Sequence, residues 1–256
     1  MILAGGRGTR LAPFTSVLPK PLMPLGDRSV LEIVVGQLAR SGFLDITLSV
    51  GYLSHLIRAV FDNRDLHPGE PLPLKQPTVT YVHEDEPLGT VGPLRLVDGL
   101  DDSFLVMNGD LLTDLDYEEV LVWHRASGSV LTIATQRRET RLDYGVLHVE
   151  ASGANANRVT RFEEKPTITA DVSMGIYIME PRALEFVPSS GAFDIPDLVT
   201  ALLDAGEPVG SFPYDGLWFD IGRPDDYERA ATAWENGHRP FLEGRSQSDA
   251  ARRKVR

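Results

Sequence analysis

Short apolar runs alternate with amphipathic stretches through the first half of the chain. Four of these runs have the length and composition of buried strands, at residues 1–4, 45–50, 78–83 and 104–107. Helical patterns lie at 29–41 and 54–61, between the first three of these runs. This alternation is typical of βα units that build a mostly parallel sheet. We therefore expect a Rossmann-like α/β fold in which helices flank a mixed, mostly parallel sheet.

Local signals set the boundaries of the other expected elements. Ser29 and Glu32 form a capping-box pattern at the start of the first helix, and Gly42 ends that helix. Residues 69–77 are rich in proline and are expected to form a surface connection. The further regular segments that we expect are helices at 116–126, 195–205 and 224–234 and strands at 130–135, 144–149, 158–162, 172–179 and 208–212. Because turns separate the strands of the second half, an antiparallel extension of the sheet is expected there.

The domain organisation is expected to be simple. Neither an internal repeat nor a linker divides residues 1–237, which we expect to form a single domain. After Gly237 the sequence becomes polar and ends in basic residues, so we expect 238–256 to be a poorly ordered tail.

Composition excludes several functions. The formal net charge of −12 argues against a nucleic-acid partner, because such binding depends on neutralising phosphates with Lys and Arg. No apolar run reaches the roughly 18 residues of a membrane-spanning helix, and residues 1–4 are too short for a signal peptide, so we expect a cytoplasmic protein without membrane contact. The absence of cysteine excludes disulfides, thiolate catalysis and cysteine-ligated zinc. The six histidines do not fall at metal-ligand spacing.

The first apolar run leads directly into a glycine-rich loop, Gly5-Gly6-Arg7-Gly8-Thr9-Arg10. Backbone N–H groups in such a loop can hold phosphate oxygens. A Walker loop needs Gly-Lys-Ser/Thr, whereas Thr9-Arg10 follows Gly8 here. A dinucleotide fingerprint needs a third glycine or alanine where this chain has Leu11. The loop therefore belongs to neither of these two classes.

Three cations accompany the loop. Arg7, Arg10 and Lys20 all precede the first acidic residue, Asp27, in a chain that is otherwise strongly acidic. Arg10 offers a fork of donors that suits a polyphosphate, and the prolines on either side of Lys20 stiffen its backbone. This local positive charge indicates an anion site.

The glycine-rich loop and the residues that follow it resemble the N-terminal signature of the sugar-1-phosphate nucleotidylyltransferases. The resemblance begins with the loop and Leu11 and continues through Pro13, Thr15, Pro19-Lys20-Pro21-Leu22 and Pro24. Further motifs carry it to about residue 231: Asn108-Gly109-Asp110, Glu163-Glu164-Lys165-Pro166, Gly175-Ile176-Tyr177 and Trp218-Phe219-Asp220-Ile221-Gly222. It implies the nucleotide-diphospho-sugar transferase fold, with the antiparallel extension binding the sugar.

Two aspartates follow apolar strands. Asp110 comes after 104–107 and Asp220 after 217–219, so both are expected at strand ends, where open α/β sheets bind ligands. Taken singly, each aspartate has a structural interpretation that is nearly as good: Asp110 as a turn residue beside Gly109, and Asp220 as a cap of the last helix. The resemblance implies metal binding at both positions, and Mg²⁺ prefers a few carboxylates together with substrate phosphates.

The resemblance also implies positions for the two substrates. Arg10, Lys20 and Lys165 are the expected catalytic residues, with Lys165 contacting the sugar phosphate. Glu164 is expected to bind sugar hydroxyls, and Gly145 and Gly175 to let the backbone approach the sugar. This chain has Ser173-Met174 before Gly175, where the family more usually has Asn-Ala, so the identity of the sugar stays open. The expected nucleotide-binding residues are Leu3, Gly5, Gly6, Gly8, Thr9, Glu86, Gly89, Thr90, Asn108 and Gly109.

The segment around Glu86 indicates which nucleobase the triphosphate carries. Glu86-Pro87-Leu88-Gly89-Thr90 resembles the mannose-1-phosphate guanylyltransferase branch, and a carboxylate is a suitable acceptor for the adjacent N–H donors of guanine. An exposed acid in an acidic loop is an equally good interpretation of Glu86. Pro21 stands where thymidylyltransferases of the family usually have Gln, which argues mildly against dTTP.

The expected reaction joins a nucleoside triphosphate to a sugar 1-phosphate and releases pyrophosphate. GTP and a mannose-1-phosphate-like sugar are favoured, with dTTP, CTP, UTP or ATP and glucose, heptose or cyclitol phosphates as alternatives. A catalytically silent subunit that senses nucleotide sugars would need little of the set Arg10, Lys20, Asp110, Lys165 and Asp220. A Rossmann dehydrogenase would need the glycine spacing that this chain lacks. The oligomeric state stays open, with a homodimer among the alternatives.

Overall fold

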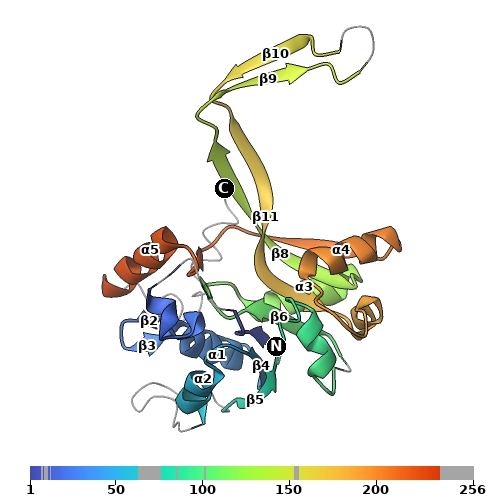
Figure 1. Ribbon diagram of the computed structural model, residues 1–256. Coiled ribbons are helices and arrows are strands. Elements are labelled where there is room, and N and C mark those ends of the chain that lie inside the picture. Colours follow the sequence, from blue (N-terminus) through green and yellow to red (C-terminus); the bar gives the residue numbers. More distant parts are fainter. Residues whose placement is uncertain are drawn as a thin grey trace.

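A mixed seven-stranded sheet forms the centre of the computed structural model (Figure 1), which describes residues 1–6, 8, 11, 13–62, 76–84, 86–100, 102–152 and 156–236. In order across the sheet, the strands are β12 (Val209–Tyr214), β8 (Leu131–Arg141), β11 (Thr167–Met179), β6 (Phe104–Asn108), β1 (Ile2–Leu3), β4 (Asp45–Val50) and β5 (Thr78–His83). Six of the seven are mutually parallel, and β11 runs antiparallel between β6 and β8. The expected mostly parallel α/β fold is confirmed.

Helices cover both faces of this sheet. Successive strand residues point to opposite sides, so an inner strand contributes side chains to a core on each face. Leu105 and Met107 of β6 face one core with helices α1, α2, α3 and α5, while Val106 between them faces a second core with α4. The α-helices are α1 (Val30–Arg40), α2 (Ser54–Phe61), α3 (Tyr117–Ser127), α4 (Ile195–Asp204) and α5 (Pro224–Glu235). Short 3-10 helices are η2 (Phe14–Ser16), η3 (Lys20–Leu22), η4 (Gly92–Leu96) and η5 (Pro181–Phe186). Among the described residues, no helix combines the length and the apolar composition needed to cross a bilayer.

Helix α1 begins as its sequence predicted. The backbone N–H of Glu32 donates to Ser29 Oγ (3.3 Å), and the backbone N–H of Ser29 donates to Glu32 Oε2 (2.7 Å). This reciprocal capping box satisfies two donors that a helix start leaves without partners.

The described residues also form three two-stranded sheets besides the central one. They are β2 (Pro24–Leu25) with β3 (Arg28–Ser29), β7 (Leu111–Thr113) with β13 (Trp218–Asp220), and β9 (Gly145–Val149) with β10 (Val159–Glu164). The last pair is the antiparallel extension expected from the sequence. Most of the connection at 69–77 and the whole tail at 238–256 lie outside the described residues.

Strands β8 and β11 are longer than their apolar patterns predicted. Their polar outer parts pair with each other from Arg141↔Thr167 to Arg137↔Asp171 and leave the body of the molecule as a ribbon that ends in the β9–β10 hairpin (Figure 1). We call the described residues between 137 and 171 the arm. Apolar alternation did not predict these outer parts because they bury no face against a core.

A tight turn between β2 and β3 limits what residue 26 can be. Gly26 has φ +64°, and a Cβ atom there would collide with the indole of Trp234 on α5. We expect Gly26→Ala to lower the free energy of unfolding by about 2–4 kcal/mol, through backbone strain and overpacking together. Gly42→Ala is the matched control, because Gly42 also has positive φ (+85°) but open space around its Cβ position. Urea denaturation should show only about 1–2 kcal/mol lost in the control; equal losses would remove Trp234 from the explanation.

Candidate functional site

A cavity of about 750 Å³ opens at the carboxyl ends of four neighbouring parallel strands. These strands are β5, β4, β1 and β6, and the residues that follow each of them line the cavity. The chain passes from β1 to β4 on one side and reaches β6 on the other, so the cavity lies where the strand order reverses. Ligands bind at this position in open α/β sheets.

Most of the residues predicted to bind the nucleotide lie together here. Ten residues of the predicted site line the cavity: Leu3, Gly5, Gly6, Gly8, Lys20, Glu86, Gly89, Thr90, Asn108 and Asp110. Gly109 lies behind them, where its backbone N–H donates to the carbonyl of Leu3 (2.9 Å). Thr9 and Arg10 lie outside the described residues.

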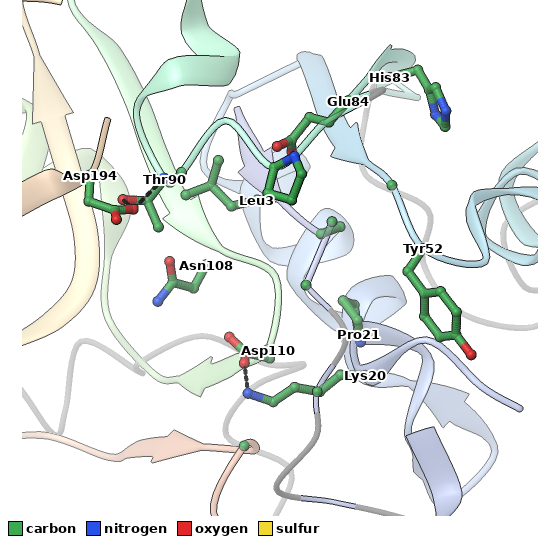
Figure 2. A pocket seen from close by; sticks show the side chains of 18 of the residues that line it. Leu3, Lys20, Pro21, Tyr52, His83, Glu84, Thr90, Asn108, Asp110 and Asp194 are labelled. Atoms are coloured by element: carbon green, nitrogen blue, oxygen red, sulfur yellow. Dashed lines mark hydrogen bonds and ion pairs between the residues drawn. The ribbon is translucent and has the colours of Figure 1, made fainter. Parts of the chain in front are cut away.

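A cation and two carboxylates form the most concentrated charge of the site. Lys20 Nζ forms an ion pair with Asp110 Oδ2 and lies 3.8 Å from Asp220 Oδ1 (Figure 2 shows the first pair). The side chains of Lys20, Asp110 and Asp220 are only 12%, 17% and 26% exposed, so water screens their interaction less than at an open surface.

Strand pairing brings the two aspartates together across 110 residues of sequence. Asp220 ends β13, which pairs with β7 directly after Asp110, and the backbone N–H of Ile221 donates to the carbonyl of Asp110 (2.9 Å). The backbone N–H of Gly222 donates to Asp220 Oδ1 (2.9 Å) and fixes that carboxylate. A side chain at position 222 would occupy the place of Lys20 Nζ. Glycine at 222 therefore leaves room for the lysine.

Packing gives two glycines of the glycine-rich loop, Gly5 and Gly8, a structural reason. Gly8 has φ +60°, and a Cβ there would approach Lys20 and Thr15 to 3.0 Å. Thr15 Oγ1 donates to the carbonyl of Gly8 (2.8 Å), which ties the loop to η2. Gly5 lies against Glu84, whose Oε1 would be 2.9 Å from an added Cβ. The loop consequently lies close to both Lys20 and Glu84.

Glu84 is a cavity residue that sequence reasoning passed over in favour of Glu86. Ser49 Oγ donates to Glu84 Oε1, and the backbone N–H of Leu88 donates to Oε2 (3.2 Å), so the carboxylate has a fixed orientation. Figure 2 shows it across the cavity from the Lys20–Asp110 pair. Glu86 also lines the cavity but is exposed. Because Glu84 directly follows β5, its place at a strand end was the available signal.

Asp194 was also missed, because it lies a hundred residues from the loop that it contacts. The backbone N–H and Oγ1 of Thr90 donate to Asp194 Oδ1 at 2.8 and 3.0 Å, and the backbone N–H of Ile195 donates to Thr90 Oγ1 (2.9 Å). Gly89 has φ +78°, and a Cβ there would lie 2.6 Å from the carbonyl of Phe193. In the sequence, Asp194 stands at the capping position before α4, a pattern that indicates a helix start and no contact with a ligand.

The predicted sugar-binding residues lie beside the cavity and on the arm, and none of them is among the residues that line the cavity. Gly175 lies beside Asn108, with φ +74° and its Cβ position 2.7 Å from Asn108 Nδ2, at an irregularity in the β11–β8 pairing. Gly145 and Glu164 are paired across the β9–β10 hairpin, and Lys165 follows with φ +46°. None of these three is among the residues that line the cavity, so the structure does not bring them to Asp110 and Asp220.

Among the described residues, no group of three or more acidic or histidine side chains is arranged to hold a metal. Asp110 and Asp220 nevertheless converge on one positive charge, the Lys20 ammonium. Two oxygen donors fit a hard divalent cation that takes its remaining ligands from phosphates and water.

A family model described as nucleotidyl transferase matches residues 1–237. The chain is 32% identical over 90% of its length to a UTP–glucose-1-phosphate uridylyltransferase of Synechocystis sp., covering 61% of that relative. It is 31% identical over 89% of its length to a mannose-1-phosphate guanyltransferase of Debaryomyces hansenii, covering 62% of it. The chain thus spans about three fifths of the length of these curated relatives.

Solved structures agree with the fold. The crystal structure of HddC from Yersinia pseudotuberculosis has a TM-score of 0.66 at 25% identity, with 91% of this chain and 97% of that one covered. The same protein complexed with GMP-PN has a TM-score of 0.65.

Proposed function

The chain belongs to the nucleotidyl transferase family, and from this premise we propose that it transfers a nucleotidyl group from a nucleoside triphosphate to a sugar 1-phosphate. A phosphate oxygen of the sugar 1-phosphate attacks the α-phosphorus in line. The bond between that phosphorus and the bridging oxygen to the β-phosphorus breaks, and its electrons leave with pyrophosphate. The product is a nucleoside-diphosphate sugar, and no protein nucleophile is required. We assign this activity to residues 1–237 as one domain.

One observation carries the proposal: Lys20, Asp110 and Asp220 converge beside a cavity at the ends of four parallel strands. Such a reaction depends on positioning and on neutralising phosphate charge, because the protein makes no covalent bond. Lys20 is assigned to neutralising the negative charge of the reacting phosphates. Arg10 is assigned to the leaving pyrophosphate and Lys165 to the sugar phosphate, as the sequence motifs suggest.

Asp110 and Asp220 are the residues that would hold Mg²⁺. When bound, the ion supplies neutralising positive charge to the triphosphate. The two carboxylates would hold the ion beside the cavity, and Lys20, at the start of η3, contributes positive charge next to them. Backbone N–H groups of Gly5, Gly6 and Gly8, with Thr9, are assigned to phosphate oxygens.

The remaining contacts are assigned by their position and chemistry. Leu3, Gly89, Thr90, Asn108 and Gly109 surround the nucleoside. Gly175, next to Asn108, is assigned to the sugar. Gly145 and Glu164 on the arm are assigned to the sugar as well, which requires the arm to approach the cavity when substrate is bound.

GTP is the favoured triphosphate, and the carboxylate of Glu84 supports this choice. A carboxylate of fixed orientation accepts well from the paired N1–H and 2-amino donors of guanine. The relatives named mannose-1-phosphate guanyltransferases agree with it. UTP with glucose 1-phosphate is the second candidate, since the relative from Synechocystis carries that name.

Glu84→Gln should reduce kcat/KM for GTP by about 10–100-fold, the effect of losing a hydrogen bond to a charged group, while kcat/KM for UTP changes little. The GTP-to-UTP ratio is the measurement, because damage to the fold would lower both substrates together. Glu86→Gln is made in parallel. An unchanged ratio in the Glu84 variant together with a lowered ratio in the Glu86 variant would return base recognition to Glu86.

Pyrophosphate release with Mg²⁺, measured across a panel of triphosphates and sugar 1-phosphates, tests the proposed function. We expect release with GTP and a mannose-1-phosphate-like sugar. No release with any pair would overturn the proposal and favour a sensor of nucleotide sugars, and nicotinamide reduction would favour a dehydrogenase.

A further inference from the structure

The β9–β10 hairpin at the end of the arm has two chemically different faces. Cross-strand pairs place Gly145 opposite Glu164, Leu147 opposite Phe162 and Val149 opposite Val159 on one face. The other face carries Val146, His148, Arg161 and Glu163, where Glu163 Oε1 contacts Arg161 (2.7 Å) and His148 (3.1 Å). The first face is therefore apolar in its outer part, beyond the Gly145–Glu164 pair, and the second is charged and internally paired. We call this outer part, Leu147, Val149, Val159 and Phe162, the apolar face; Gly145 and Glu164 lie outside it, at the base of the hairpin.

Nothing in the described chain covers the apolar face. Its four side chains are 49–58% exposed, and the hairpin stands away from the body at the end of the ribbon (Figure 1). The Phe162 ring lies over Gly145, where an added Cβ atom would be 2.6 Å from the ring. The absence of a side chain at position 145 therefore leaves room for the ring on this side of the hairpin. An antiparallel sheet with one apolar face ordinarily packs that face against a core.

Isolation of this kind is unfavourable for a hairpin. Two strands alone are marginally stable in water, and a contiguous exposed apolar patch usually marks an interaction site. Half of the large apolar residues that are exposed in the described chain lie between 144 and 168. The arm therefore gains stability if a partner covers it.

Charge indicates what the partner is. Residues 137–171 contain six Lys or Arg and six Asp or Glu, so the formal net charge of −12 resides entirely in the rest of the chain. Two copies that approached through their bodies would repel each other. Two copies that approach through their arms bring neutral, apolar surfaces together.

We propose that the apolar face of the β9–β10 hairpin binds the same face of a second copy of this chain. A two-fold axis between the hairpins would pack Leu147, Val149, Val159 and Phe162 of each against those of the other as two layers of a small sandwich. The charged face, with its Arg161–Glu163–His148 contacts, would stay in solvent.

A cysteine-free chain permits a direct test, because any introduced thiol is unique. Leu147→Cys and Val146→Cys are neighbours that place one thiol on the apolar and one on the charged face. A bismaleimide that spans about 10 Å, the separation of packed sheets, should link Leu147→Cys into dimers and leave Val146→Cys monomeric. Equal crosslinking of both, or of neither, would overturn the proposal.

Mass measurement gives the second arm of the test. Light scattering should find the wild type dimeric at tens of micromolar, and Phe162→Ser should weaken the dimer at least about tenfold. Leu203→Ser on α4 is the matched control, because Leu203 and Phe162 are both 58% exposed. Thermal unfolding verifies that each variant keeps its folded body. A wild type that is monomeric over this range would overturn the proposal. Because the readout is mass, it is independent of the proposed activity.

Discussion

Replacing Asp110 with Asn should slow pyrophosphate release by about 10²–10³-fold at saturating substrate, while the protein stays folded. A preorganised charge at a reacting phosphate contributes an effect of this size. Asn keeps the shape of the side chain and removes the negative charge that Asp110 shares with Asp220 around Lys20. The measurement is kcat for pyrophosphate release at several Mg²⁺ concentrations. The Mg²⁺ concentration that gives half of the maximal rate should be higher for the variant than for the wild type.

Asp116→Asn is the matched control for this variant. Asp116 is the N-cap of α3, where its Oδ1 accepts from the backbone N–H groups of Glu118 (2.9 Å) and Glu119 (3.3 Å). Asn caps helices about as well as Asp, so both folding and turnover should be retained. If the two variants released pyrophosphate at similar rates, Asp110 would have no role in the reaction.

The second large effect is expected from Lys20→Met. Removing the ammonium leaves two poorly exposed carboxylates near each other without the cation that pairs with them, so the variant should lose both turnover and stability. We expect kcat to fall about 10²–10³-fold. In EDTA the melting temperature should fall by about 2–8 °C, which corresponds to about 1–2 kcal/mol in a domain of this size.

Mg²⁺ should reverse part of the stability loss in this variant. A divalent cation between Asp110 and Asp220 replaces the charge of Lys20, so the melting temperature should rise more in the variant than in the wild type. NaCl at the same ionic strength is the control, because screening alone should act more weakly. An equal response to Mg²⁺ in both proteins would show that Lys20 does not share a cation position with the two aspartates.

Much of the fold was predictable because its signals are local. Ser29 and Glu32 are three residues apart, and their hydrogen bonds form wherever that helix starts. The inner parallel strands β4 and β6 were recognisable because residues on both of their faces are buried, which requires continuous apolar runs. The arm was only partly predictable, since the outer parts of β8 and β11 pair in solvent and carry no apolar pattern.

The candidate site followed the same division. Leu3, Asn108 and Asp110 end or follow strands, and a general rule places such residues at the ligand edge of the sheet. Glu84 obeys the same rule but was overlooked beside Glu86, whose motif drew the interpretation. Asp194 was not predictable, because its contact with Thr90 joins loops 104 residues apart.

The sequence alone determined three features: the mostly parallel sheet, the glycine-rich loop followed closely by Lys20, and the absence of thiol chemistry. These features depend on composition and on neighbours within a few residues. Only the tertiary structure decided that Asp220 joins Asp110 and Lys20, through the pairing of β13 with β7, and that Gly145, Glu164 and Lys165 lie on an arm outside the cavity. Contacts between distant segments depend on how whole strands pack, and no local pattern records that packing.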